Sequence, residues 1–227
     1  MNKRVYLFKL KLNTPYGLRV GGPKDDIYVL KPLEIEGYYV IPSSSWKGVF
    51  RRVTEVLFAG KDHYEGHKNG GTGSVDNIEE LIKAKGLESN EEEKRRFIAM
   101  WNCPIERLYG SEYFASAVTF SDTLIDANIN ERTHTVIDRK TRKSKEKHLF
   151  REQIVDVKSV SVKVIVREGL EEWFKTLEFM SVVGTFIGGG KSRGIGYAQL
   201  DLKESEYAEM DSLTRKPVFR PLSEVKL

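Results

Sequence analysis

The feature that most constrains the fold is an order of elements that occurs twice: an alternating segment, an amphipathic helix and a further extended segment. Residues 5–12 alternate apolar and basic side chains in their second half, which predicts a strand with one buried face. Three serines at 43–45 offer hydroxyl caps for a helix that follows. Its apolar positions have i, i+3, i+4, i+7 spacing: Trp46, Val49, Phe50, Val53 and Leu57. Residues 115–124 then return to strand character.

The second occurrence begins with the valine alternation of residues 155–166, which slips around Lys158 and Ser159 in a way that suggests a bulge. A long apolar helix is predicted over residues 170–183, and a closing strand over 197–202. Two strand-helix-strand units with alternating strands predict an α+β sandwich with helices on one face of an antiparallel sheet. A ferredoxin-like, RRM-like core is the natural candidate.

Length and composition are consistent with one domain carrying insertions. The chain has 227 residues, of which 40% are hydrophobic. Residues 59–110 mix glycine-rich and charged helical stretches, which predicts an inserted helical region. No run approaches the ~20 apolar residues of a membrane span, and the first residues lack a signal-peptide core. We therefore expect a cytoplasmic protein without membrane contact.

Positive charge is concentrated in one segment. The whole chain has a formal charge of +4, whereas residues 131–151 hold eight Lys or Arg against three acids. This segment lies between two predicted strands and includes apolar Val136, Ile137, Leu149 and Phe150. A protruding hairpin fits this pattern better than a disordered tail. Such an arm would give salt-dependent nucleic-acid binding, although a solvated face is the simpler interpretation.

The glycine run at 188–196 includes Gly190, Lys191 and Ser192, which superficially resemble a phosphate-binding P-loop. Thr185 stands where a P-loop needs glycine. The run also follows a predicted helix and precedes a predicted strand, whereas a P-loop follows a strand and precedes a helix. Two interpretations remain open. The backbone of the loop, with Lys191 and Arg193, approaches a phosphate chain, or the glycines only permit a tight turn.

Acidic and metal-ligating residues supply two weaker candidates. Asp25 and Asp26 follow a glycine pair near a strand end, where carboxylates hold a hydrated cation, position a ribose hydroxyl or simply form a turn. His63 and His67, with Cys103 and Glu106, are the weak candidates for a zinc site. A single cysteine excludes an internal disulfide.

Three segments in order resemble the RAMP superfamily of CRISPR proteins, specifically the Csm-type backbone subunit of type III effector complexes. Residues 41–51 resemble the family's IPGSSLKGxLR helix entrance, and residues 135–141 its NVIDRxTG thumb segment. Residues 188–196 resemble its GGxxSRGxG loop.

This resemblance implies a single domain over 1–227. It consists of a modified ferredoxin-like palm, a thumb hairpin over 126–155 and the insertion over 59–110. It implies guide RNA and target RNA as partners, together with other CRISPR effector subunits and further copies of the chain in a filament. The RNA-binding residues would include Lys47, Arg51, Arg139, Gly189, Gly190, Lys191, Ser192 and Arg193, with Val136 and Ile137 as thumb wedges.

The resemblance also implies target-RNA cleavage, in which Asp26, with Asp25 as the alternative, acts with a divalent metal ion, Mg²⁺ or Mn²⁺. Archaeal relatives often carry Cys and His ligands of a structural zinc ion, and in this sequence Cys103 keeps one of their two cysteines. His63 and His67 would be the further zinc ligands. Two alternatives remain: a backbone subunit that coats RNA without cutting it, and a guide-processing endoribonuclease.

Overall fold

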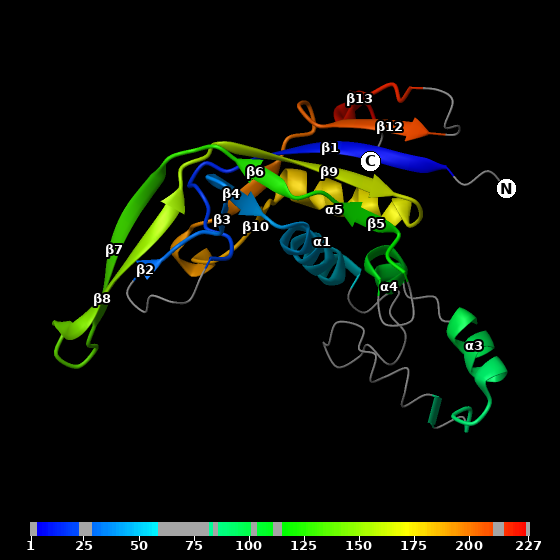
Figure 1. Ribbon diagram of the computed structural model, residues 1–227, viewed down its shortest axis with the longest axis horizontal. Helices are drawn as coiled ribbons and strands as arrows, with labels where there is room; N and C mark the ends of the chain where they lie inside the picture. Colours follow the sequence, from blue (N-terminus) through cyan, green and yellow to red (C-terminus); the bar gives the residue numbers. More distant parts are fainter. Residues whose placement is uncertain are drawn as a thin grey trace.

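The computed structural model describes residues 4–22, 29–58, 82–83, 86–100, 104–110, 115–210 and 216–225, and Figure 1 shows their arrangement. One main sheet lies above two helices, and a long hairpin extends away from both (Figure 1).

The palm is built on a sheet with β1 (Val5–Asn13) at its centre. β9 (Ser159–Val166) pairs along one side of β1, and β5 (Val118–Phe120) pairs with β9. β11 (Tyr197–Leu200) pairs with the end of β1 on its other side. All of these pairings are antiparallel, so the order is β5-β9-β1-β11. With one helix after β1 and one after β9, this is the split βαβ arrangement of a ferredoxin-like fold.

Two helices cover one face of this sheet: α1 (Ser43–Phe58) and α5 (Leu170–Val182). Phe50 of α1 stacks on Trp173 of α5 with ring centroids 5.1 Å apart. Phe8 of β1 and Phe120 of β5 both make edge or tilted contacts with this pair. The aromatic cluster joins sheet and helices into one core, because large rings contribute much of the apolar area that folding buries.

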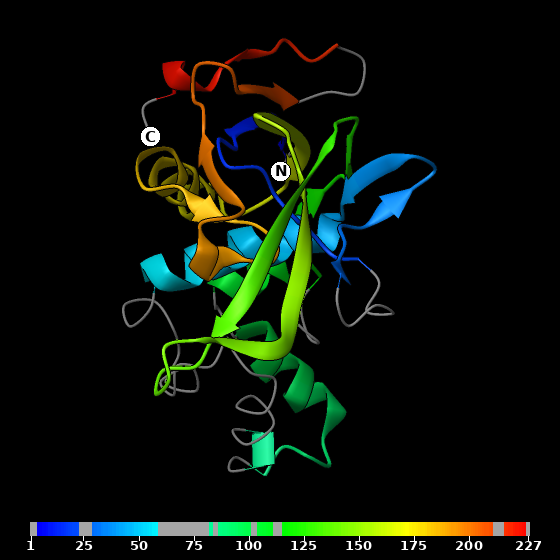
Figure 2. The ribbon, with the colours of Figure 1, turned by 90° about the vertical axis from the view of Figure 1, so that its left-hand side faces the viewer.

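The hairpin consists of β7 (Ile129–Ile137) and β8 (Ser144–Val155), and it projects from one end of the palm (Figures 1 and 2). At its base Ile154 and Val155 are buried, and Leu18 pairs with Val155 through two backbone hydrogen bonds. The register shifts between Thr135 and Ile137 near the tip. β8 is thus one continuous strand from the exposed tip into the palm.

Smaller elements complete the chain. β4 (Tyr38–Ile41) pairs with β3 (Glu34–Ile35) and β6 (Thr123–Ile125), while β2 (Val29–Leu30) runs parallel to β8. The helix α3 is Glu91–Met100, and α4 (Pro104–Tyr109) contributes the buried side chains of Ile105, Leu108 and Tyr109 to the core. The last part of residues 59–110 therefore belongs to the palm. The remaining elements are β10 (Thr185–Phe186), η2 (Lys191–Arg193), β12 (Glu206–Met210), β13 (Arg220–Pro221) and η3 (Leu222–Glu224).

The expected α+β fold with an antiparallel sheet is confirmed, and three local predictions are corrected. The backbone N–H of Ser43 donates to the carboxylate of Asp122 at 2.6 Å, so this side chain, and not one of the predicted serine hydroxyl caps, accepts from the first amide of α1. The slip at Lys158 is the junction between β8 and β9 rather than a bulge. The sheet also continues beyond residue 202, because β12 pairs with β1 from Val5 to Lys9.

Candidate nucleic-acid interface

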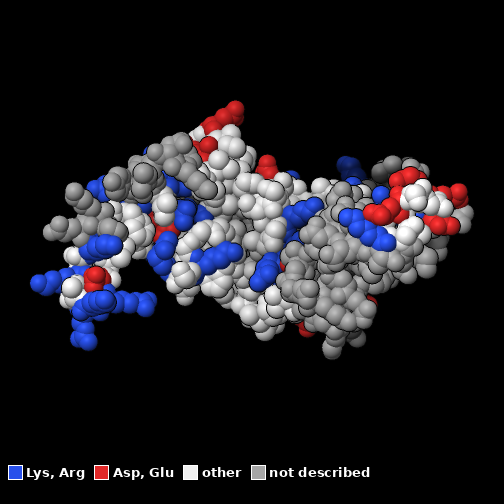
Figure 3. Space-filling view, turned by 90° about the horizontal axis from the view of Figure 1, so that it is seen from below, with Lys and Arg blue, Asp and Glu red and all other residues white. Residues whose placement is uncertain are grey.

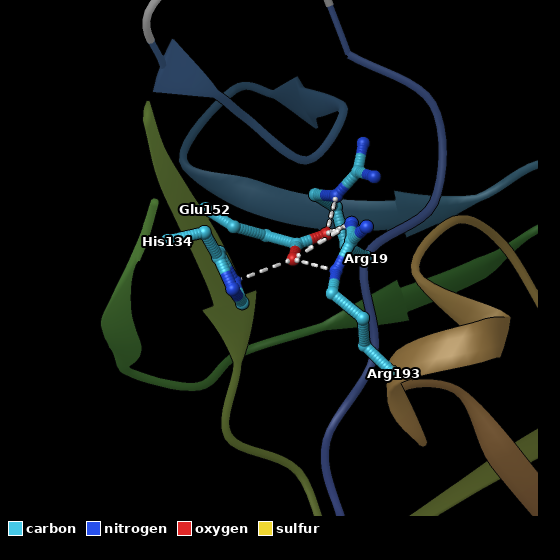
Figure 4. A network of polar contacts seen from close by, with 4 residues as sticks. All are labelled: Arg19, His134, Glu152 and Arg193. Atoms are coloured by element: carbon cyan, nitrogen blue, oxygen red, sulfur yellow. Dashed lines mark hydrogen bonds and ion pairs between the residues drawn. The ribbon is translucent and has the colours of Figure 1, made fainter. Parts of the chain in front are cut away.

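A buried carboxylate joins the base of the hairpin to the glycine-rich loop. Glu152 of β8 is fully buried, and its oxygens accept hydrogen bonds from two arginines distant in sequence (Figure 4). Arg19 Nε donates to Oε1 at 2.9 Å, and Arg193 donates from Nε and Nη2 at 3.1–3.2 Å. His134 of β7 completes the group, with Nε2 3.1 Å from Oε2. Four segments of the chain therefore meet at one carboxylate.

The two arginines keep this carboxylate charged. Burial alone acts to raise the pKa of Glu152, but the hydrogen bonds and charges of Arg19 and Arg193 outweigh it, so the pKa lies below its ordinary value. Removing one partner from such a group leaves uncompensated buried charge, which typically costs about 3–5 kcal/mol. We infer that this cluster fixes the hairpin on the palm.

Aromatic contacts extend the cluster along the hairpin. The His134 ring stacks on Phe150 with centroids 5.1 Å apart and 24° between planes. The guanidinium carbon of Arg193 lies 5.9 Å from the centroid of the same Phe150 ring, within cation–π range. Arg193, predicted as an RNA contact, thus has one charged and one aromatic partner within the protein.

The glycines of the loop pack against the segment after β1. A Cβ on Gly188 would lie 2.1 Å from the Arg19 carbonyl oxygen, and one on Gly189 would lie 2.3 Å from the Arg19 guanidinium. Gly189 N–H donates to that carbonyl at 2.8 Å, and Gly196 N–H donates to Gly17 at 3.0 Å. Gly190 has φ +74 and faces Glu152. These contacts support the tight-turn interpretation for the glycines, while Lys191 and Ser192 remain exposed.

The tip of the hairpin is strongly basic. One carboxylate oxygen of Asp138 accepts the backbone N–H groups of Lys140 and Thr141 at 2.8 and 2.9 Å, which holds its pKa below the usual range. Five exposed cations surround this turn, and none has a carboxylate partner among the described residues: Arg139, Lys140, Arg142, Lys143 and Lys145. Figure 3 shows basic side chains gathered at this end and in patches toward the centre of the same face.

The predicted thumb residues are exposed beside this basic tip. Val136 is half-exposed and Ile137 is 62% exposed, and Leu149 of the opposite strand is also exposed. Apolar side chains can contact nucleic-acid bases while the neighbouring unpaired cations contact the phosphates.

The two predicted basic residues of α1 have different environments. Arg51 donates from Nε to Glu55 at 2.8 Å and from Nη1 to the Gly110 carbonyl at 3.0 Å, so it ties α1 to the end of α4. Lys47 is partly buried and has no ion pair within the described part of the chain. Arg52, one residue further and not predicted, is exposed.

The predicted catalytic and metal residues lie outside the described residues: Asp25, Asp26, His63, His67 and Cys103. Glu106, the remaining zinc candidate, is buried in α4. Within the ranges that the structure describes, no group of three or more His, Cys, Asp or Glu side chains could hold a metal ion.

Sequence reasoning missed Arg19, His134 and Glu152. Glu152 stands in a strand of alternating character, and nothing local distinguishes it from the exposed Glu131 on the paired strand. The only available signal was an acid at the inward-facing position beside Ile154, in a segment otherwise rich in cations.

Comparison with known families agrees with this architecture. The family model of the RAMP superfamily matches residues 9–199, from β1 to β11. No curated protein matches the chain. Among the described residues, no helix has the length and apolar character needed to span a membrane. Because the match covers the palm, the hairpin and the glycine-rich loop, the chain belongs to the RAMP superfamily.

Proposed function

We propose that this chain is a guide-RNA-binding backbone subunit of a type III CRISPR interference complex, and that it cleaves target RNA at regular intervals. RAMP membership indicates a CRISPR-associated RNA-binding protein. The observation that carries the finer proposal is the hairpin: a continuous strand, fixed at its base by Glu152, that presents unpaired cations and apolar side chains at its tip.

The hairpin suits RNA that lies along the palm. Exposed cations at the tip would neutralise phosphates. This electrostatic attraction dominates the affinity for RNA and does not depend on the RNA sequence. Val136 and Ile137 would separate neighbouring bases beside them. Sequence would then be read by base pairing with the guide, so the protein needs only shape and backbone contacts. Copies of the chain and other effector subunits, as in the type III complexes that it resembles, would repeat this arrangement along one guide.

We assign cleavage to the 2′-hydroxyl of the target, aligned for attack on the adjacent phosphorus while the 5′-oxygen of the next nucleotide leaves. Holding these three atoms in line is the main gain. Asp26, or else Asp25, would orient that hydroxyl. An ordinary Asp, with a pKa near ~3.9, is a poor base at neutral pH, so we propose that cleavage requires Mg²⁺ or Mn²⁺.

The test uses the assembled complex with a matched, end-labelled target RNA. Asp26→Asn should abolish cleavage and leave both guide content and complex size unchanged, and chelation of divalent cations should have the same effect. Asp122→Asn serves as the matched control, since this exposed carboxylate caps α1.

Undiminished cleavage after replacement of both Asp25 and Asp26 would refute the catalytic assignment. Guide retention without any cleavage by the wild-type complex would identify a subunit that coats RNA. A natively purified protein that carries no RNA would refute the RNA-binding role itself.

A further inference from the structure

The loop that would carry the catalytic acid leaves the palm and returns to it at one place. Residues 23–28, which include Asp26, lie outside the described residues, but the chain on both sides of them is described. The Val20 carbonyl accepts the backbone N–H of Leu33 at 2.9 Å, and a Cβ on Gly21 would lie 3.1 Å from the Cβ of Leu33. The segments before and after residues 23–28 are therefore side by side.

Gly22 allows the closest approach between these two segments. Its φ of +107 lies in a region that residues with a side chain rarely adopt. A Cβ on Gly22 would lie 1.9 Å from the carbonyl oxygen of Lys31 and 3.1 Å from the carbonyl carbon of Pro32. Since no Cβ can approach a backbone oxygen this closely, any other residue at this position would force the two segments apart. Gly22 and Lys31 thus form the neck of the loop.

Both segments also contact one residue of the hairpin, Glu152. Its buried carboxylate accepts a hydrogen bond from Nε of Arg19, three residues before Gly22, at 2.9 Å (Figure 4). Its backbone pairs with Leu30 in the parallel ladder between β2 and β8. Glu152 therefore holds the chain before the loop through its side chain and the chain after the loop through its backbone.

Asp26 stands midway between these contacts in the sequence. It follows Gly22 by four residues and precedes Leu30 by four. Four residues of chain span at most about 14 Å, so the two contacts bound the distance between Asp26 and the base of the hairpin. Loss of either contact would enlarge the set of positions open to the loop.

We propose that Glu152 is a positioning residue for target cleavage, which holds the loop of Asp26 against the base of the hairpin. This inference rests on the proposed function. In-line attack needs the target nucleotide, which the hairpin places, and the acid, which the loop places, in a fixed relation. A misplacement of about 1 Å can lower such a rate by about 100-fold. Glu152 is the residue at which the hairpin and the loop are joined.

The test measures single-turnover cleavage of a matched target RNA by the assembled complex in Mg²⁺, and target affinity separately with Mg²⁺ chelated. Glu152→Gln keeps the size of the side chain and removes its charge. It should lower the rate constant of cleavage by about 10- to 100-fold and change target affinity by less than about 3-fold. A folding defect alone would instead reduce the fraction of target that is cut, because fewer complexes assemble.

A second variant separates the loop from the buried ion pair. Gly22→Ala leaves Glu152 and Arg19 unchanged but forces the neck of the loop open, so it should slow cleavage by a similar factor. Gly37→Ala is the matched control. Gly37 also has a positive φ, of +83, but a Cβ there would meet nothing within 4 Å. The control should leave the rate constant within about 2-fold of the wild type.

Two further variants test the route and the specificity of the effect. Arg19→Gln should slow cleavage, and combining it with Glu152→Gln should slow it by less than the product of the two factors, because both break the same pair. Leu177→Ala removes a buried side chain of α5 and weakens the palm core. It should not change the rate constant of the complexes that assemble.

The proposal is overturned if the wild-type complex cuts its target and Gly22→Ala cuts it at the same rate. Equal slowing by Leu177→Ala and Glu152→Gln would also overturn it, since the effect would then follow stability alone. If Glu152→Gln fails to assemble with guide RNA, the comparison of Gly22→Ala with Gly37→Ala decides. A wild-type complex that binds its target without cutting would refute the proposed cleavage, and this inference with it.

Discussion

The base and the tip of the hairpin use the same residue types for opposite purposes. At the base, Arg19 and Arg193 donate to a carboxylate that has no exposed surface. At the tip, five cations surround an Asp138 whose oxygen is already occupied by backbone N–H groups. Pairing with a buried carboxylate makes the basal arginines part of the fold, whereas the cations at the tip have no carboxylate partner among the described residues and are free for phosphates. A count of basic residues cannot distinguish the two groups.

The largest expected effect follows from loss of the basal carboxylate. Glu152→Gln should lower the free energy of unfolding by about 3 kcal/mol, because the largely buried Arg19 and the partly exposed Arg193 lose their shared counterion. Urea denaturation measures this change. Glu131→Gln is the matched control: Glu131 lies on the paired strand, exposed, 3.9 Å from Arg151, and should cost less than 1 kcal/mol. Equal effects from the two substitutions would contradict the structural role of Glu152.

Neutralising the tip should change RNA binding and not stability. With the five tip cations replaced by glutamine, the slope of log K against log salt should fall in magnitude by up to about 3.5, since each phosphate contact on a single strand contributes ~0.7. The free energy of unfolding should stay within about 0.5 kcal/mol. Arg193→Gln should have the opposite effect. It should lower the free energy of unfolding and change the salt slope by less than the ~0.7 that one phosphate contact contributes. Identical salt slopes for wild type and the tip variant would rule out phosphate contacts there.

The smallest expected effect is a dependence of the free energy of unfolding on pH. Because the pKa of Glu152 is lower in the folded state than its ordinary value of 4.5, the folded state is stabilised above that value. This stabilisation should disappear as the pH falls below about 4.5 and through the folded pKa. Acid titration of the unfolding free energy should therefore be less steep for Glu152→Gln than for wild type. Curves of equal slope for the two proteins would show that protonation of Glu152 does not contribute to the pH dependence of the free energy of unfolding.

The fold was largely predictable because its main elements carry strong local patterns. Alternation identified β1 and β9, and i, i+3, i+4, i+7 spacing identified α1, with Trp46 and Phe50 on its buried side. β12 was missed because a sequence with Glu206 and Glu209 resembles a surface loop. It becomes a strand only by pairing with β1, about 200 residues away.

The candidate site was less predictable, since its geometry depends on contacts between distant segments. Arg19 and Glu152 are 133 positions apart, and no local pattern connects them. The glycine loop was recognised as unusual, but its cause, the close approach of Arg19 to Gly188 and Gly189, depends on the fold.

The unbroken course of β8 sets the reach of the hairpin. Its 12 residues span roughly 40 Å at ~3.4 Å per residue, and the inner end is hydrogen-bonded into the palm at Leu18. The outer end is therefore joined to the core through one strand without an interruption. The length of this strand sets how far from the palm the basic tip lies.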